Sequence, residues 1–99
     1  MLSNISVLNE MASEFGVDKD RLLKDALKTY IQNAISELEQ FENKIKSMYL
    51  CSSPKGLKDK IANGEMPEHP SWEDYLTWKN IERSIENFKR ILRWIINRM

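Results

Sequence analysis

Two long stretches of this sequence contain neither glycine nor proline, and this constrains the fold more than any other feature. The first stretch extends from Val17 to Ser53 and the second from Ser71 to Met99. Because glycine and proline are the residues that most often end or kink a helix, uninterrupted helices can form in both stretches. The three glycines and three prolines divide the chain into four segments. We predict that all four segments are helical.

Helix-capping residues help to place the ends of these segments. Asp18, Ser53 and Ser71 each precede a run of apolar residues spaced three and four apart, and their side chains are good N-caps. Gly16 suits the left-handed position beyond a helix end. We therefore predict a single helical domain over residues 1–99, with helices at about 4–15, 18–50, 54–62 and 71–98 and a loop at 63–70.

The two long helices each carry an apolar stripe that needs a partner helix. In the second helix the main predicted stripe consists of Leu23, Leu27, Tyr30, Ala34, Leu38, Phe41, Ile45 and Met48. In the fourth helix the apolar residues form a heptad seam of Trp78, Ile81, Ile85, Phe88, Leu92 and Ile95. These stripes predict an all-α fold: an elongated antiparallel hairpin of two long helices, with a short N-terminal helix and a short helix in the connection. We expect two copies to form a dimeric helical bundle of coiled-coil type.

Apolar surface is broader at one end of this hairpin than two helices require. Extra apolar residues lie beside the stripe early in the second helix and near the end of the fourth, and an antiparallel hairpin places both regions together. Two coverings, which can coexist, account for this surface: the N-terminal helix packs on it, and a second copy or another protein covers what remains exposed. The candidate residues for a partner or dimer interface are Leu22, Ile31, Ile35, Ile91, Trp94 and Ile96.

The charge balance disfavours a protein that binds nucleic acid without specificity. Fifteen Lys and Arg residues balance fifteen Asp and Glu residues, whereas affinity for phosphates needs a surplus of cations. Residues 79–99 nevertheless carry six basic residues against two acidic ones. The candidate nucleic-acid contacts are the cations at the start of the second helix, or alternatively the basic face of the fourth helix; the cations of the second helix are Lys19, Arg21, Lys24 and Lys28.

The sequence contains no recognisable catalytic, metal or cofactor motif. His69 is the only histidine and Cys51 the only cysteine, so neither has the partners that a metal site or a nucleophilic site needs. A glycine-rich phosphate loop is also absent from the sequence. We therefore predict a non-enzymatic protein without cofactors or metal. The lone cysteine and the lack of a long apolar run lead us to expect a cytoplasmic protein without a membrane span.

Two segments resemble known protein families. Ser13 to Ile31, SEFGVDKDRLLKDALKTYI, resembles the helix-turn-helix portion of ribbon-helix-helix antitoxins, but the β-ribbon with which those proteins bind DNA has no counterpart here. Gly64 to Glu82, GEMPEHPSWEDYLTWKNIE, resembles a segment of small, largely archaeal helical proteins, some of which are encoded beside toxin-like genes. The first resemblance implies a paired-helix dimer core rather than operator binding.

These observations favour a protein that acts by protein–protein contact. Our main hypothesis is an antitoxin-like partner that covers a toxin. The alternatives are a DNA-binding transcriptional regulator and a purely structural homodimeric helical protein.

Overall fold

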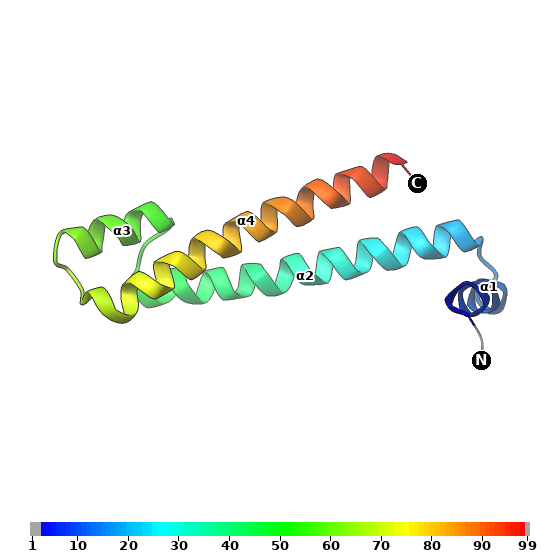
Figure 1. Ribbon diagram of the computed structural model, residues 1–99, viewed down its shortest axis with the longest axis horizontal. Coiled ribbons are helices and arrows are strands. Elements are labelled where there is room, and N and C mark those ends of the chain that lie inside the picture. The colour runs from blue at the N-terminus through cyan, green and yellow to red at the C-terminus, as the bar shows by residue number, and fades with distance from the viewer. Residues whose placement is uncertain (1–2, 99) are drawn as a thin grey trace.

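The protein is an elongated hairpin of two long helices. The computed structural model describes residues 3–98, and these form four helices. The helices are α1 (Asn4–Phe15), α2 (Lys19–Tyr49), α3 (Pro54–Ala62) and α4 (Glu68–Arg98). Helices α2 and α4 run antiparallel, α3 lies beside α4 at the closed end of the hairpin, and α1 lies at the opposite end (Figure 1). The radius of gyration is 19.8 Å, compared with about 13 Å for a compact chain of this length. The predicted all-α, elongated hairpin is thus confirmed.

Local sequence signals account for the ends of the first three helices. Gly16 ends α1 in the left-handed conformation, with φ of 66°. The Asp18 carboxylate then accepts a hydrogen bond from the backbone N–H of Arg21 and caps α2. Ser53 caps α3 in the same way, by accepting a hydrogen bond from the backbone N–H of Gly56.

Helix α4 contains one non-helical residue close to its start. His69 has φ of −108° and ψ of 131°, so the backbone leaves helical geometry there and regains it in the following residues. Extended geometry is the usual conformation for a residue that precedes proline, and Pro70 follows His69. The regular part of α4 therefore begins close to Ser71, which is buried.

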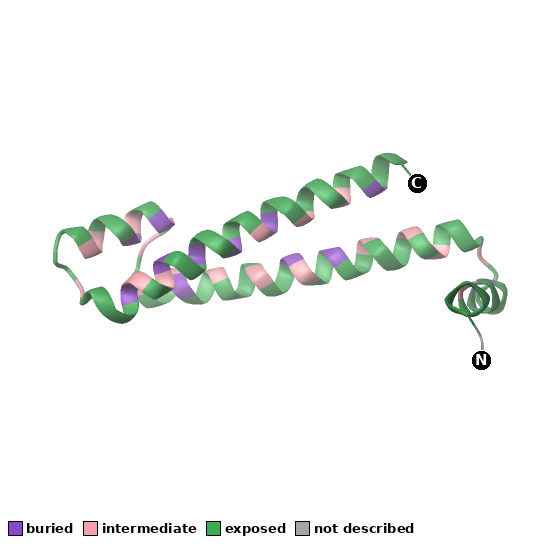
Figure 2. Cartoon of the chain, viewed as in Figure 1, coloured by how far each residue is buried: buried purple, intermediate pink, exposed green. Residues whose placement is uncertain are grey.

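A continuous seam between α2 and α4 forms the core (Figure 2). The residues that α2 contributes are Ile31, Ile35, Leu38, Glu42, Ile45 and Tyr49. The residues that α4 contributes are Tyr75, Trp78, Ile81, Ile85, Phe88, Leu92 and Ile95. In both helices successive members are spaced three or four residues apart, which is the heptad spacing of helices packed at a small crossing angle.

The face of α2 in this seam differs from the predicted stripe. Several members of that stripe are exposed instead, namely Leu23, Leu27, Tyr30, Phe41 and Met48. The physical reason lies in Trp78, which is 0% exposed and whose indole Nε1 donates a hydrogen bond to Glu42 Oε2 at 3.1 Å. A buried indole N–H needs an acceptor, so the helix turns its Glu42 side toward α4. The seam prediction for α4, by contrast, is confirmed.

Helix α3 closes the turn of the hairpin. Its Leu57 is 0% exposed and belongs to the same core as Trp78. The Lys60 ammonium donates hydrogen bonds to the backbone carbonyl oxygens of Tyr49 at 3.0 Å and Leu50 at 3.2 Å. These carbonyls lie at the C-terminus of α2, where a cation is electrostatically favoured. Lys60 therefore joins α3 to the end of α2.

A side-chain hydrogen bond also connects α2 with α4 at this end. The Tyr49 hydroxyl donates to the Asp74 carboxylate. Burial raises the pKa of Tyr49 above its ordinary value of 10.0, and the hydrogen bond to Asp74 raises it further, although Ser71 acts in the opposite direction. The folded protein therefore holds this phenol in its neutral form more firmly than the unfolded chain does.

This shift predicts a loss of stability at alkaline pH. As the pH rises, Tyr49 ionises in the unfolded chain before it ionises in the folded protein. The stabilisation that neutral Tyr49 gives the folded state is therefore fully present below about pH 10, and it is lost as the pH rises through the folded pKa. Tyr49→Phe should remove that component and should cost about 0.5–1.5 kcal/mol at neutral pH. Urea unfolding between about pH 8 and pH 11 measures both effects. Tyr30→Phe, at an exposed position, is the control, and an unchanged alkaline slope in Tyr49→Phe would contradict the assignment.

Candidate functional site

The end of the hairpin at which α2 begins and α4 finishes carries exposed apolar side chains. We call this surface the open end and define it by Leu23, Leu27, Ile91, Trp94 and Ile96, all of which are exposed. Trp94 is 55% exposed, although tryptophan is usually well covered in folded proteins. The basic side chain of Arg98 lies over its ring, with the guanidinium carbon 5.6 Å from the ring centroid. The open end thus combines an exposed aromatic side chain with positive charge.

Helix α1 leaves the open end uncovered. It packs mainly on α2, and among its described residues only Ala12 is buried. Ile5, Met11 and Phe15 are themselves exposed, so α1 adds apolar surface instead of removing it. The sequence predicted that the N-terminal helix, a partner, or both cover this end. In the single chain the N-terminal helix does not cover it.

The six predicted interface residues fall into two groups. Ile91, Trp94 and Ile96 are exposed near the end of α4, with Ile91 and Trp94 on one side of the buried Ile95 and Ile96 on the other. Leu22 is half-buried, and Ile31 and Ile35 are buried in the seam against α4. The heptad seam of α2 includes the two isoleucines, and packing within the chain accounts for their burial. Only the first group is available to a partner of this hairpin.

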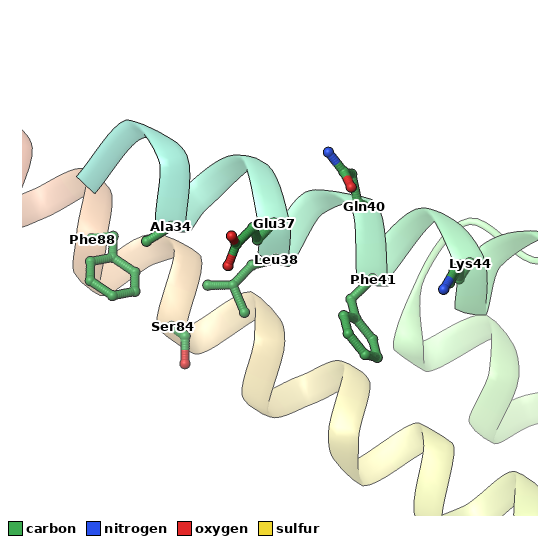
Figure 3. Close-up of a pocket in the computed structure, with 8 residues that line it drawn as sticks. All are labelled: Ala34, Glu37, Leu38, Gln40, Phe41, Lys44, Ser84 and Phe88. Atoms are coloured by element: carbon green, nitrogen blue, oxygen red, sulfur yellow. The ribbon is translucent and has the colours of Figure 1, made fainter. Parts of the chain in front are cut away.

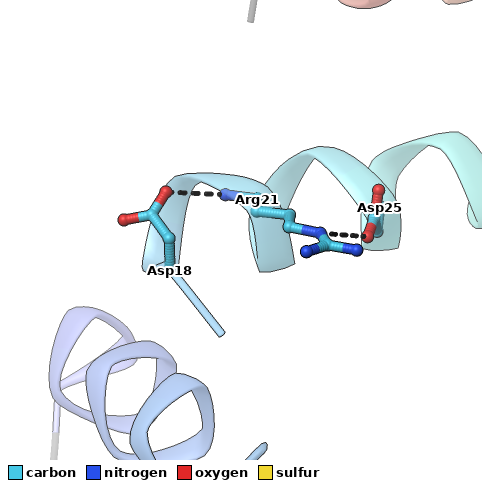
Figure 4. A network of polar contacts seen from close by, with 3 residues as sticks. All are labelled: Asp18, Arg21 and Asp25. Atoms are coloured by element: carbon cyan, nitrogen blue, oxygen red, sulfur yellow. Dashed lines mark hydrogen bonds and ion pairs between the residues drawn. The ribbon is translucent and has the colours of Figure 1, made fainter. Parts of the chain in front are cut away.

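The predicted nucleic-acid contacts lie among acidic residues. Lys19 and Arg21 are exposed, and Lys24 and Lys28 are half-buried. Arg21 is held on both sides by carboxylates, because its backbone N–H donates to Asp18 and its Nε lies 3.8 Å from the Asp25 carboxylate (Figure 4). Acidic residues that alternate with basic ones reduce the positive potential that phosphate binding requires. This segment therefore lacks the features of a strong polyanion site.

A groove between α2 and α4 is a second candidate surface, and the sequence analysis did not identify it. The groove has a volume of about 540 Å³ and is mostly apolar. We call it the apolar groove. The residues that line it are Ala34, Glu37, Leu38, Gln40, Phe41, Lys44, Ser84 and Phe88 (Figure 3). Phe41 is 58% exposed, and the Lys44 ammonium lies 5.7 Å from its ring centroid. The exposed members of the predicted α2 stripe, such as Phe41, were the signal for this site, but the prediction placed them in the contact with α4.

The other side of the hairpin seam is acidic. A smaller depression there is lined by Glu39, Glu42, Glu82, Ile85, Glu86 and Lys89. The two sides of the same helix pair therefore differ in chemistry, since one exposes aromatic side chains and the other mainly carboxylates. An apolar partner surface fits the first side and is disfavoured on the second.

The titratable groups outside the core form small local pairs. His69 Nδ1 lies 2.6 Å from Glu73 Oε1. The backbone N–H of Glu73 and this histidine both lower the pKa of the Glu73 carboxyl. Burial raises the pKa of the Cys51 thiol, with Lys60 acting in the opposite direction. Within residues 3–98, no group of three His, Cys, Asp or Glu side chains is arranged to hold a metal ion.

The comparisons with known proteins agree with the resemblance to small archaeal proteins. The model of the Uncharacterized protein MJ0235 family matches residues 1–98. The chain belongs to this family. It is similar to Uncharacterized protein MJ0235 of Methanocaldococcus jannaschii, with 32% identity over 76 residues that cover 77% of this chain and 93% of the relative. No solved structure matches the chain. Membership of the MJ0235 family therefore supports the archaeal relationship, and the family name states no activity or partner.

Among residues 3–98 of this chain, no helix is both long and apolar enough to cross a membrane. The apolar side chains of α2 and α4 instead alternate with charged ones along each helix. Such amphipathic faces are typical of helices that pack against other protein surfaces.

Proposed function

We propose that the chain is a non-enzymatic protein-interaction module that binds a partner protein through the open end. The observation that carries this proposal is the exposure of Trp94 with Ile91 one turn before it, at an end that α1 leaves uncovered. Tryptophan in such a setting is the residue type most enriched among interface anchors. An apolar patch of this kind on a small protein is a common mark of a binding site.

The charge of the open end indicates the chemistry of the partner. The last turns of α4, residues 89–98, carry four basic residues and no acidic one, and Arg98 lies directly over Trp94. A partner with an apolar pocket surrounded by carboxylates would complement this surface in both shape and charge. We therefore propose a protein partner of this kind.

An antitoxin-like role in the cytosol is the specific form of this function that we favour. The resemblance of residues 13–31 to ribbon-helix-helix antitoxins supports it, and the chain would act by covering the functional surface of a toxin. DNA binding receives less support, because Asp18 and Asp25 contact Arg21 within the candidate basic segment.

The test measures binding of the protein encoded beside this chain's gene. We expect a complex by isothermal titration calorimetry, and we expect Trp94→Asp to weaken it at least about 30-fold, as for an interface hot spot worth about 2 kcal/mol. Leu76→Asp is a matched control, since Leu76 is also an exposed apolar residue of α4 but lies far from the open end. Both variants should retain the helical circular dichroism spectrum.

Two results would contradict the proposal. If Trp94→Asp bound the partner as the native chain does, the open end would not be the binding surface. If the chain instead bound duplex DNA with a steep dependence on salt and bound no protein encoded nearby, the regulator hypothesis would replace ours.

A further inference from the structure

A second stripe of α2, which lies beside its seam with α4 and which we call the exposed stripe, repeats with heptad spacing, and most of its members are exposed. Its members follow one another in alternating steps of four and three residues: Leu23, Leu27, Tyr30, Ala34, Glu37, Phe41, Lys44 and Met48. An α-helix with such a repeat on a face that its neighbour does not cover is typical of a second helix–helix contact. The part of the stripe from Ala34 to Lys44 forms one wall of the apolar groove.

The apolar groove has the geometry into which a side chain of another helix can insert. Ala34, Glu37, Leu38 and Phe41 are spaced i, i+3, i+4 and i+7, and this is the arrangement of four residues that surrounds a knob in a coiled coil. The next four residues with this spacing are Glu37, Gln40, Phe41 and Lys44. Two such holes lie next to each other, with Phe88 of α4 on the far side of the groove (Figure 3).

The charges in this stripe are complementary to those of a second copy of the same stripe. Glu37 and Lys44 lie seven residues apart with Phe41 between them, and neither has an ion-pair partner in its own chain within residues 3–98. Consider an antiparallel copy related by a two-fold axis close to Phe41. Along the helix axis, each Glu37 then lies within one residue rise, ~1.5 Å, of Lys44 in the other copy. A parallel, in-register copy would instead oppose Glu37 with Glu37 and Lys44 with Lys44.

The sizes of the flanking residues fit the same arrangement. With the axis close to Phe41, the small Ala34 of one copy lies level with the large Met48 of the other, and the two Phe41 side chains meet near the centre. Small residues opposite large ones allow facing helices to interdigitate. Aromatic side chains at the centre of an interface, surrounded by charged pairs, are typical of stable contacts.

We propose that the occupant of the apolar groove is the α2 helix of a second copy, packed antiparallel with the two-fold axis close to Phe41. The two hairpins then form a four-helix bundle held by two Glu37–Lys44 pairs. With the axis close to Phe41 the two α2 helices overlap only over about residues 33–49, because each α2 ends at Tyr49. Leu23, Leu27 and the rest of the open end lie outside this overlap, so the assembly leaves Trp94 available to a partner protein. This inference is independent of the proposed function, because its decisive residues lie on a different surface.

The test exchanges the two charges and measures absolute mass by light scattering across a concentration series. The native chain should form a dimer of twice the chain mass of 11.7 kDa. Glu37→Lys alone opposes two lysines at both pairs, and Lys44→Glu alone opposes two glutamates. Each single variant should raise the dimer dissociation constant at least about tenfold. Glu39→Lys, which makes the same charge change in the acidic depression, should leave the constant within about threefold of the native value.

Restoration of the opposite charges distinguishes this geometry from other dimers. Glu37→Lys mixed with Lys44→Glu should form a heterodimer, because both of its pairs then join lysine with glutamate. The double variant carrying both changes should recover the homodimer. A native chain that stays monomeric throughout, single variants that dimerise normally, or a mixture that fails to associate would each overturn the proposal. Circular dichroism should show unchanged helicity in every variant, since both positions lie in the exposed stripe of α2.

Discussion

Replacing Trp78 by alanine should destabilise the protein by about 3–5 kcal/mol, the typical cost of removing a fully buried aromatic side chain. Trp78 is 0% exposed and lies in the seam between the two long helices, close to α3. The substitution removes the indole from the core and also takes away the donor that satisfies Glu42. Because domains of this size are stabilised by about 5–15 kcal/mol, much of the folding free energy would be lost.

Thermal and urea unfolding followed by circular dichroism measure this effect. The melting temperature should fall by more than about 12 °C, since each kcal/mol corresponds to about 4–8 °C in a domain of this length. Trp94→Ala is the matched control, because Trp94 lies in the same helix but is 55% exposed. Its cost should be below about 1 kcal/mol. Equal losses for the two substitutions would show that Trp78 is not the centre of the core.

Leu57→Ala should have the next largest effect, a loss of about 2–5 kcal/mol. Leu57 is 0% exposed and is the residue of the nine-residue α3 that belongs to the core cluster, beside the buried Pro54 and the partly buried Ile61. A helix of this length is marginal in water without tertiary packing, so its docking depends on this side chain. Amide hydrogen exchange in α3 should therefore accelerate more than exchange in the middle of α2.

Two further substitutions test the cause of this loss. Leu57→Met conserves volume and should cost less than about 1.5 kcal/mol, whereas Leu76→Ala changes an exposed leucine and should cost less than about 0.5 kcal/mol. If Leu57→Ala instead lowered stability no more than Leu76→Ala, docking of α3 would depend on other contacts, such as the hydrogen bonds of Lys60 to the end of α2.

The exposed anchors of the candidate site could be predicted from the sequence, but the apolar groove could not. Ile91, Trp94 and Ile96 widen the apolar face of α4 beyond one stripe, and this excess is visible in the spacing alone. The groove depends on which of two apolar stripes of α2 meets α4. The stripe that does meet α4 contains Glu42, and this acidic residue interrupts the apolar pattern in the sequence. Its place in the stripe is explained only by the hydrogen bond that it accepts from Trp78.

The sequence by itself determined the helices and their antiparallel pairing. Uninterrupted stretches without glycine or proline produce long helices, cap residues such as Asp18 and Ser53 set their starts, and amphipathic stripes require the helices to pack together. These are local properties, or patterns repeated along one helix, and they can be seen without coordinates.

Only the tertiary structure decided which faces meet. Rotation of a helix about its axis is governed by side chains distant in sequence, here the fit of Trp78 against Glu42 and the hydrogen bond of Tyr49 with Asp74. Once those contacts orient α2, Ile31 and Ile35 are buried and Phe41 is exposed beside Glu37 and Lys44. Two stripes of similar apolarity compete for one partner helix, and the outcome depends on which polar groups can be satisfied on burial.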